Sequence, residues 1–459
     1  MKDFDALQGL FNENGQGHVF ASWKNLDQEE RSELLSDCSR VDFAWLKTRL
    51  AEKPSQDRSL LSHLEPAQVK ALPREAGEEK TRQADREFGE ELIRSGKVAA
   101  FLVAGGQGTR LGYPGPKGLY PLGPISNRTL FEWHAEQILA RRRRYGAVIP
   151  WYIMTSRDNH AATLDYFAAK DYFGLPREDI FLFIQDMVPS VTPEGKLLLA
   201  SPYQLALNPN GHGGSLSGLC KSGAVKDMLE RGVTCLNSFQ IDNPLVTIAD
   251  PLFVGCHARE GAAMSSKVLR KTGPEEKLGL VALNSGRPII VEYSDLDPAT
   301  MSATGADGEL KFWAGSIGIH MLNVDFVQQT GNGDRLPWHR AHKKIPFFDG
   351  RSLVQPAEPN AIKFETFIFD ALPFADRSVN LEVKREHEFA PVKNARGVDS
   401  AESSRCLLSA YFREWLIQAG ITVPAECQVE ISPLYSLDQA ELATKIGHDL
   451  KLEQSLLLG

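Results

Sequence analysis

The sequence predicts an α/β protein built on a doubly wound, helix-covered sheet. The first observation is a set of short, continuous apolar runs, which are typical of strands buried on both faces. The second is that helical patterns separate the first of these runs. The third is the length of 459 residues, ample for a buried core at about 100–200 residues per domain.

Each apolar run stops at a glycine or a polar residue. We expect strands over 98–104, 151–155, 180–184, 235–241 and 288–293. A capping box at Thr129 and Glu132 predicts the start of one helix, and residues 158–170 have a second helical pattern. Ligands of such sheets bind beyond the carboxyl ends of the strands, so the polar groups that follow the strands are the site candidates.

The two ends of the chain differ from the middle in their pattern of apolar and charged residues. Residues 1–94 are charged, with apolar residues three and four apart, which predicts amphipathic helices with a scaffolding role. In the last stretch we expect a strand over 430–435 and a helix over 437–450.

A run of four arginines, Arg141 to Arg144, closes the helix that starts near Thr129. Cations suit a helix C-terminus, where the macrodipole is negative. We interpret the run as a solvated helix end; an anionic partner is the alternative.

Composition excludes several classes of protein. Fifty-one Lys and Arg against 59 Asp and Glu give a net charge of −8, whereas nucleic-acid binding needs surplus positive charge. No apolar run approaches the ~20 residues of a membrane span, and the first residues lack a secretory apolar segment. The six cysteines are scattered without a C-x-x-C pair, so we expect reduced thiols in a cytoplasmic protein and no zinc site.

The most informative segment is the glycine-rich loop that follows the first apolar run. Gly105, Gly106 and Gly108 allow positive φ and let backbone N–H groups approach phosphate oxygens, while Arg110 and Lys117 add two cations. The spacing is not a Rossmann fingerprint, and no Ser or Thr follows Lys117 as in a Walker A loop. A glycine turn with surface cations is the structural alternative, and a nicotinamide-dependent oxidoreductase is another interpretation of a strand followed by glycines.

The loop LVAGGQGTRLGYPGPKG resembles the signature loop of the UDP-sugar pyrophosphorylases, above all the eukaryotic-type UDP-N-acetylhexosamine pyrophosphorylases. Further blocks similar to that family follow in order across residues 95–435: WYIMTS, FIQDMVP, PNGHGG, IDNPL with ADP, EYS, NAIKFE and FAPVKN. The resemblance implies a Rossmann-like nucleotidyltransferase core with a mixed, mostly parallel sheet. It divides the chain into a helical N-terminal region (1–94), a catalytic domain (95–388) and a small C-terminal region (389–459).

The reaction implied by the resemblance joins UTP and a sugar 1-phosphate into a UDP-sugar and pyrophosphate. Because the attacking phosphate oxygen is already an anion, the site needs positioning and charge neutralisation rather than a general base. The resemblance assigns the nucleotide to the backbone of Gly105 and Gly106, the β- and γ-phosphates to Arg110 and Lys117, and the α-phosphate to Lys393. Lys363 is a second cation candidate.

Three more nucleotide contacts are implied. Gln185 would read uracil, because an amide can both donate to O4 and accept from N3–H. Gly211 would leave room for the base or ribose. Asp242 follows the expected strand 235–241, where a carboxylate suits Mg²⁺, the expected cofactor.

For the sugar, the resemblance points to Asn243, Gly279 and Glu292. His212 and Ser316 stand where the N-acetylhexosamine enzymes carry Asn, and a Gly-His-Gly loop is more like the UDP-glucose enzymes. We favour N-acetylglucosamine 1-phosphate, with a UDP-glucose or broad-specificity UDP-sugar pyrophosphorylase as the alternative. The remaining histidines, His320, His339 and His342, show no ligand spacing, and we interpret them as structural.

A non-catalytic nucleotide-sugar-binding protein is the competing class. Intact Arg110, Lys117, Asp242 and Lys393 favour the enzyme. The expected partners are UTP and a sugar 1-phosphate, with neither nucleic acid nor membrane, and the expected assembly is a monomer or a weak homo-oligomer.

Overall fold

A computed structural model describes residues 3–52, 63–447, 450, 452 and 455–459. The chain forms two compact units. The smaller unit joins residues 1–59, 185–215 and 334–370, and the larger unit joins residues 60–184, 216–333 and 371–459. These units cut the chain at other points than the three regions expected from the sequence, because segments far apart in the chain fold together.

The larger unit is organised around one mixed sheet, which has ten strands within the described residues. Strands β9, β2, β3 and β4 run parallel in that order, and β13 and β11 continue the sheet in antiparallel pairing. The strands are β1 (Leu64–Pro66), β2 (Val98–Val103), β3 (Trp151–Thr155), β4 (Ile180–Ile184), β9 (Cys235–Gln240), β10 (Met264–Arg270), β11 (Gly279–Asn284), β12 (Arg287–Val291), β13 (Ala314–Asn323) and β18 (Asn380–Glu382). The predicted α/β core with a mixed sheet is confirmed.

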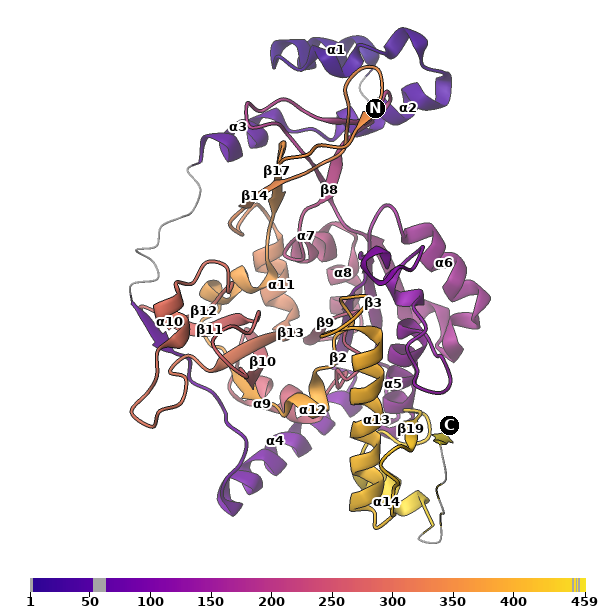
Figure 1. Ribbon diagram of the computed structural model, residues 1–459, viewed down its shortest axis with the longest axis vertical. Helices are drawn as coiled ribbons and strands as arrows, with labels where there is room; N and C mark the ends of the chain where they lie inside the picture. Colours follow the sequence, from indigo (N-terminus) through magenta and orange to yellow (C-terminus); the bar gives the residue numbers. More distant parts are fainter. Residues whose placement is uncertain (1–2, 53–62, 448–449, 451, 453–454) are drawn as a thin grey trace. The chain divides into compact units, whose positions relative to one another are not determined.

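Helices cover both faces of this sheet. Figure 1 shows α8 and α11 on one side of it and α4 and α9 on the other. The helices are α4 (Ala76–Arg94), α5 (Leu130–Tyr145), α6 (His160–Ala169), α7 (Gly214–Lys221, starting in the smaller unit), α8 (Ala224–Glu230), α9 (Pro251–Arg259), α10 (Pro298–Ser302), α11 (Val324–Gly331), α12 (Arg385–Glu388), α13 (Ala401–Gln418) and α14 (Gln439–Lys445). The capping box at Thr129 and Glu132 is confirmed at the start of α5.

Helices α4 and α9 touch backbone to backbone. A Cβ on Gly89 would lie 1.8 Å from the carbonyl oxygen of Pro251, and a Cβ on Gly255 would lie 1.7 Å from that of Asp85. No side chain fits at either position, so the two glycines fix how closely the helices approach.

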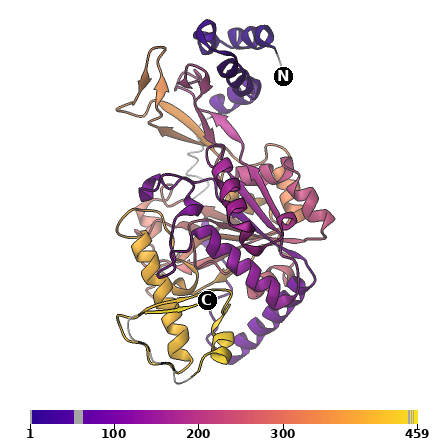
Figure 2. The same ribbon diagram turned by 90° about the vertical axis from the view of Figure 1, so that its right-hand side faces the viewer.

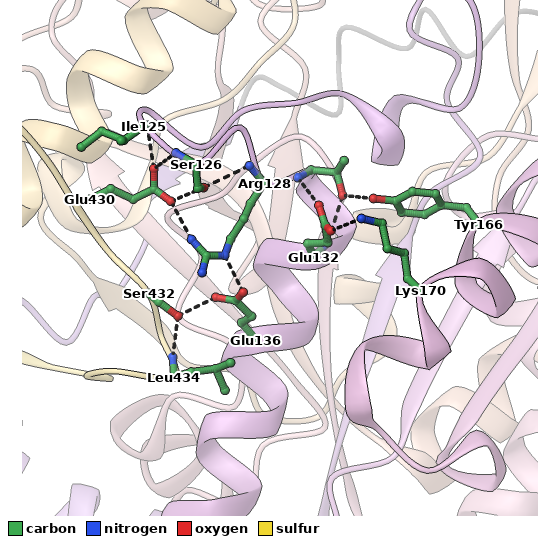
Figure 3. Close-up of polar contacts among 11 residues, drawn as sticks. Ile125, Ser126, Arg128, Glu132, Glu136, Tyr166, Lys170, Glu430, Ser432 and Leu434 are labelled. Carbon is green, nitrogen blue, oxygen red and sulfur yellow. Dashed lines mark hydrogen bonds and ion pairs between the residues drawn. The ribbon is translucent and has the colours of Figure 1, made fainter. Parts of the chain in front are cut away.

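The C-terminal segment packs on the loop before α5, beside α13 (Figure 2). Strand β19 (Gln428–Ile431) pairs with β20 (Ser455–Leu458) and buries the Glu430 carboxylate. That carboxylate accepts hydrogen bonds from the backbone N–H groups of Ile125, at 2.7 Å, and Ser126, at 2.8 Å, and it pairs with Arg128 at 3.2 Å (Figure 3).

The C-terminal elements differ from the sequence expectation in extent. The strand expected over 430–435 ends at Ile431, because Pro433, two residues on, has no N–H to continue a ladder. The helix expected over 437–450 covers only Gln439–Lys445; residues 448 and 449 lie outside the described residues.

The solvated-end interpretation of the arginine run is wrong for Arg141 and Arg142, whereas Arg143 and Arg144 are exposed. Arg141 is buried, with 4 % of its surface exposed. Arg142 pairs with Asp179 at 2.7 Å, and Arg144 pairs with Asp438. Arg143 is exposed as expected. The difference arises because α13, α14 and α9 cover this helix end, which the local sequence does not reveal.

The smaller unit combines the N-terminal helices with two later insertions. Its helices are α1 (Phe4–Glu13), α2 (Gln28–Ser39) and α3 (Phe43–Ala51), and its strands are β5 (Met187–Pro189), β6 (Leu199–Ser201), β7 (Gln204–Leu205), β8 (Leu207–Pro209), β14 (His339–Lys343), β15 (Phe347–Phe348), β16 (Leu353–Val354) and β17 (Ala361–Glu365). Leu7, Phe11 and Leu34 from the helices share a core with Phe364 of β17. No helix in the described part of the chain is long and apolar enough to cross a membrane.

Two histidines are buried in the core of the larger unit. His134 lies 3.4 Å from the carbonyl oxygen of Ile241, and His257 lies between Ser265, at 2.8 Å, and Asn323, at 3.0 Å. Burial lowers the pKa of each imidazole to about 4. Both rings are therefore neutral in the folded protein at neutral pH.

The larger unit should lose stability between about pH 7 and pH 5. A histidine in the unfolded chain titrates near pH 6.5. Below that pH the unfolded chain therefore binds protons, whereas the two buried histidines of the folded chain stay neutral down to about pH 4. Each of the two histidines then removes about 2 kcal/mol at pH 5. Chemical denaturation at both pH values measures this loss. His257→Gln should reduce this loss of unfolding free energy by about 2 kcal/mol. The control His63→Gln, at an exposed residue, should leave the loss unchanged. Equal losses in the natural protein and both variants would show that His257 is not the group that titrates.

Candidate nucleotide site

The glycine-rich loop leaves β2 at the carboxyl edge of the sheet and folds back on itself. The N–H of Gly108 donates to the carbonyl oxygen of Gly115 at 2.8 Å, and the N–H of Lys117 donates to that of Gly106 at 3.1 Å. Two short 3₁₀ turns, Thr109–Leu111 and Lys117–Leu119, lie within the loop. These bonds hold the loop closed without help from a ligand.

The reason for the loop glycines differs from the expected one. Gly106 and Gly108 do not adopt positive φ, whereas Gly112 and Gly115 do. A Cβ on Gly108 would come within 2.9 Å of Tyr113, so this glycine permits a close approach. Gly106 is exposed and has no protein atom within 4 Å of its Cβ position, so its backbone is open to a ligand.

Asn159 anchors the loop from the start of α6. Its side chain is fully buried; its amide donates to the carbonyl oxygens of Ala104, at 2.9 Å, and Gly106, at 3.3 Å, and its Oδ1 accepts from the N–H of Ser156 at 2.8 Å. Sequence reasoning missed this residue, because an Asn before a helix ordinarily indicates only a cap.

Lys117 meets Asp242 at the edge of the sheet. Strands β2 and β9 pair in parallel up to Val103 and Gln240, so the segments that follow them emerge side by side. The Lys117 Nζ lies 3.3 Å from the Asp242 Oδ2, and the two residues are only 8 % and 9 % exposed. The sheet therefore brings together a cation and a carboxylate that are 125 residues apart in the chain.

Lys393 lies beside this pair through its own loop. The N–H of Val392 donates to the carbonyl oxygen of Asp242 at 2.9 Å, and the N–H of Lys393 donates to that of Asp399 at 2.6 Å. Burial raises the pKa of the Asp399 carboxyl; the Lys393 ammonium opposes that rise and the Asp242 carboxylate adds to it. Asp399 is thus a second acidic group at the site, and nothing in its sequence surroundings marks it.

Arg110 is exposed on the first 3₁₀ turn of the same loop. Within the described chain its guanidinium has no hydrogen bond or ion pair to another residue. The larger unit thus pairs Lys117 with Asp242 and joins the Lys393 loop to the backbone of Asp242, with Arg110 at the surface of the glycine loop.

Three of the residues expected to contact the sugar also gather. Gly279 of β11 pairs directly with Ser316 of β13. The next residue of β11, Leu280, pairs with Val291, the last residue of β12, so Glu292 follows at the same end of the sheet. The register therefore places Gly279, Glu292 and Ser316 at one edge.

Asn243 has a different role from the expected sugar contact. Its amide donates to the carbonyl oxygen of Glu388 at 2.7 Å, and its Oδ1 accepts from the N–H of Ala390 at 3.0 Å. The side chain is buried and links the segment after β9 to the segment that carries Lys393.

A buried charge network lies behind these segments. The fully buried Lys267 pairs with Asp250 at 2.8 Å and with Glu388 at 2.5 Å. Burial alone would lower the pKa of Lys267, but the two carboxylates outweigh it and raise the pKa above its ordinary value. The network connects β10, the start of α9 and α12.

Gln185 and Gly211 lie in the smaller unit. The Gln185 amide donates to the carbonyl oxygen of Gly211 at 2.7 Å and to Asn210 Oδ1 at 3.2 Å, which leaves its carbonyl oxygen for a ligand. Gly211 adopts φ +82°, and a Cβ there would lie 2.3 Å from the carbonyl oxygen of Thr366. The Gln185 N–H groups that were expected to donate to uracil thus bond within the protein. The space where a Gly211 side chain would lie is filled by the backbone of Thr366 rather than left open.

His212 belongs to the same group of the smaller unit. Its Nδ1 accepts from the N–H of Ile368 at 3.1 Å, and its ring contacts Phe367 and Phe369. Burial lowers the pKa of His212 to about 4, so the neutral ring carries its proton on Nε2. His212 is a hydrogen-bond donor of fixed tautomer.

The other expected cation and the other histidines have protein partners or lie at the surface. Lys363 pairs with Glu365 at 2.6 Å in the smaller unit. His339 contacts Asp370 at 2.7 Å, and buried His320 contacts Ser266 at 2.9 Å, whereas His342 is exposed.

The acidic groups Asp242 and Asp399 suit magnesium. No cluster of three or more His, Cys, Asp or Glu side chains suited to a metal occurs among the described residues. Mg²⁺ commonly takes only one or two carboxylates and completes its shell with phosphate and water. Asp242, with Asp399 nearby, matches that requirement.

The arrangement is that of a nucleotide-binding α/β protein: a closed glycine loop and an ion pair at the carboxyl edge of parallel strands. A sequence model of the UTP–glucose-1-phosphate uridylyltransferase family matches residues 45–440. The chain belongs to this family, which confirms the resemblance seen in its motifs.

Curated and solved relatives agree with this membership. The chain is 36% identical to a probable UDP-N-acetylglucosamine pyrophosphorylase of Dictyostelium discoideum, over 96% of this chain and 95% of that protein. It resembles the crystal structure of the UDP-N-acetylglucosamine pyrophosphorylase of Trypanosoma brucei, with a TM-score of 0.79, 27% identity, and 97% and 95% of the two chains covered. The fold is also shared with a UDP-glucose phosphorylase of the same organism, with a TM-score of 0.61, 18% identity, and 83% and 78% covered.

Asn159→Asp should loosen the glycine loop. The substituted carboxylate has nearly the same shape but cannot donate to the carbonyl oxygens of Ala104 and Gly106, which should cost about 1–3 kcal/mol of local stability. Hydrogen exchange of residues 104–118 should speed up by at least about tenfold. The exposed neighbour provides the control, Asp158→Asn, which should exchange as the natural protein does; unchanged exchange in Asn159→Asp would refute the anchoring role.

Proposed function

We propose that this protein transfers a uridylyl group from UTP to a sugar 1-phosphate and releases pyrophosphate, with N-acetylglucosamine 1-phosphate as the preferred acceptor. Membership of the family makes the chain a UDP-sugar pyrophosphorylase, that is, a UTP:sugar-1-phosphate uridylyltransferase. The observation that carries the mechanism is the Lys117–Asp242 pair at the edge of the sheet, beside the open backbone of Gly106.

In the proposed reaction a phosphate oxygen of the sugar 1-phosphate attacks the α-phosphorus of UTP in line. A new phosphorus–oxygen bond forms as the bond to the bridging oxygen of pyrophosphate breaks, and that oxygen leaves with the electron pair. No proton has to be removed from the nucleophile. The protein must therefore hold the two anions together and spread the charge that develops.

The described residues suit these tasks. Lys117 and Arg110 are assigned to the β- and γ-phosphates, because both belong to the glycine loop and Arg110 is unpaired. Lys393 is assigned to the α-phosphate, where charge builds up. The backbone of Gly105 and Gly106 receives the nucleotide. Backbone N–H groups and cations fixed before substrate arrives stabilise a transition state more than mobile ones do.

Mg²⁺ is the proposed cofactor, and Asp242 is its proposed protein ligand, with Asp399 as a second acidic group. When bound, the ion would neutralise phosphate charge and orient the leaving pyrophosphate. The backbone of Asp242 is already held by the bond from the N–H of Val392, and its carboxylate pairs with Lys117 at 3.3 Å, so both are positioned before a metal binds.

Gln185 is the proposed contact to uracil. The carbonyl oxygen of Gln185 would accept from uracil N3–H, since its amide N–H groups are used within the protein. Gly211 supports this contact by orienting the amide rather than by making room.

The sugar preference rests on two supports. The relatives that match over nearly the whole chain are named for UDP-N-acetylglucosamine, and Gly279, Glu292 and Ser316 form a polar edge able to meet sugar hydroxyls. A UDP-glucose or broad-specificity enzyme is the second candidate, favoured by His212, whose neutral ring donates through Nε2 where an Asn would both donate and accept. We assign the protein to the cytoplasm, because its six cysteines, all in the described ranges, are free thiols, and expect a monomer or weak homo-oligomer.

Pyrophosphate release with UTP, Mg²⁺ and a panel of sugar 1-phosphates tests the proposal. N-acetylglucosamine 1-phosphate should give the highest kcat/KM. A higher value for glucose 1-phosphate would favour the second candidate. Turnover with none of the sugars, together with tight UDP-sugar binding, would instead support a non-catalytic binding protein.

Lys117→Met should lower kcat/KM by at least about 100-fold, because a fixed positive charge is lost where pyrophosphate leaves. Lys226→Met is the matched control, since Lys226 is well exposed on α8, and it should retain full activity. Near-natural activity of Lys117→Met would contradict the catalytic role proposed for Lys117.

A further inference from the structure

A cavity of about 350 Å³ lies in the larger unit, away from the glycine loop. It is bounded by α4, α5, α9, α12 and α13. Its polar lining includes Arg82, Arg86, Glu90, Arg141, Arg144, Asp250, Lys384, Glu388 and Asp438. None of the residues assigned to UTP or the sugar lines it, so it is separate from the proposed catalytic site.

Arg141 is the central feature of this cavity. Its side chain is 96 % removed from solvent, yet its Nε has no hydrogen-bond partner among the residues that the structure describes. Within the described part of the chain its guanidinium makes no ion pair. A buried guanidinium without a partner is costly, so its retention calls for an explanation.

The carboxylates near Arg141, Asp250 and Asp438, are bonded to other groups. Asp250 pairs with Lys267 at 2.8 Å and caps α9 through a bond from the N–H of Leu252 at 3.1 Å. Asp438 pairs with Arg144 and caps α14 through a bond from the N–H of Glu441 at 2.9 Å. Both attract Arg141 at longer range without bonding to it.

The remaining charges leave the cavity positive. Glu388 is bound by Lys267 at 2.5 Å, and Glu90 is bound by Arg94 at 2.7 Å. Arg86 and Lys384 are exposed and, within the described residues, have no ion pair. Arg82 donates to the carbonyl oxygen of Ala71 at 3.0 Å but also has no ion pair among the described residues. Four cations that line the cavity, these three and Arg141, are therefore available to one negatively charged ligand.

We infer that this cavity binds a small, soluble phosphate-bearing anion, with the Arg141 guanidinium bonded to the phosphate. A planar guanidinium suits phosphate because two N–H groups can meet two oxygens at once. The apolar lining of Leu72, Leu252 and Tyr411 gives room for an organic group beyond the phosphate. A lipid headgroup at a membrane surface does not reach a side chain that is 96 % buried.

Such a ligand would join elements that also support the catalytic segments. The cavity is lined by Thr247 and Glu388, and the N–H of Thr247 donates to the Glu388 carboxylate at 3.2 Å. The backbone oxygen of Glu388 in turn holds Asn243, next to Asp242. The anion would therefore stabilise the fold behind the site without touching the substrates.

Thermal unfolding with increasing inorganic phosphate, at constant ionic strength balanced with chloride, tests the inference. The natural protein should gain roughly 1–3 °C in Tm at a phosphate concentration about ten times its dissociation constant, because phosphate binds only the folded cavity. Arg141→Met should lose this gain and should not be less stable than the natural protein in chloride alone, because it removes an unpaired buried charge. Arg143→Met, two residues away on the same helix and exposed, should keep the gain.

Two further variants keep the result decisive. Lys117→Met should keep the phosphate gain, which excludes the catalytic loop as its source. Lys384→Met, at an exposed lining residue, should fold normally and need about 3- to 10-fold more phosphate to reach the same Tm gain. No phosphate gain in the natural protein, an undiminished gain in Arg141→Met, or a gain abolished by Lys117→Met would overturn the inference.

Discussion

The ion pair between Lys117 and Asp242 is the interaction on which the site depends. It exists because β2 and β9 are adjacent and parallel, so the segments after them leave the same edge of the sheet. Asn159 fixes one segment, and Asn243 fixes the other to the Lys393 loop. The pair holds a cation and a carboxylate close together, the two groups that a triphosphate and its magnesium ion require.

Behind the pair, buried charged side chains hold backbone segments together. Lys267 binds two carboxylates from different elements, and Glu430 binds the loop that precedes α5. Removal of one partner from such a network leaves an unpaired buried charge and destabilises the fold. The networks therefore favour one arrangement of these segments. Arg141 in the neighbouring cavity differs from these groups because it is buried at comparable depth without an ion pair among the described residues.

Local patterns were enough to predict much of the fold. The strands over 98–104 and 235–241, the capping box of α5, and Asp242 at a strand end all follow from signals within a few residues. Asp399, the burial of Arg141 and the backbone that fills the space beside Gly211 depend on contacts between distant segments, and no local pattern reports them. The motifs predicted the family, but the hydrogen bonds of Gln185 and His212 could be read only from the folded chain.

The role of the Lys117–Asp242 pair can be tested by measuring the binding of UTP to Asp242→Asn by calorimetry, with and without Mg²⁺. Without the metal, the Asp242 carboxylate competes with the triphosphate for Lys117, so removal of its charge should tighten UTP binding by about fivefold, equivalent to about 1 kcal/mol. With Mg²⁺ the same variant should bind UTP more weakly than the natural protein, because the metal has lost its ligand. A change in the same direction under both conditions would contradict the account.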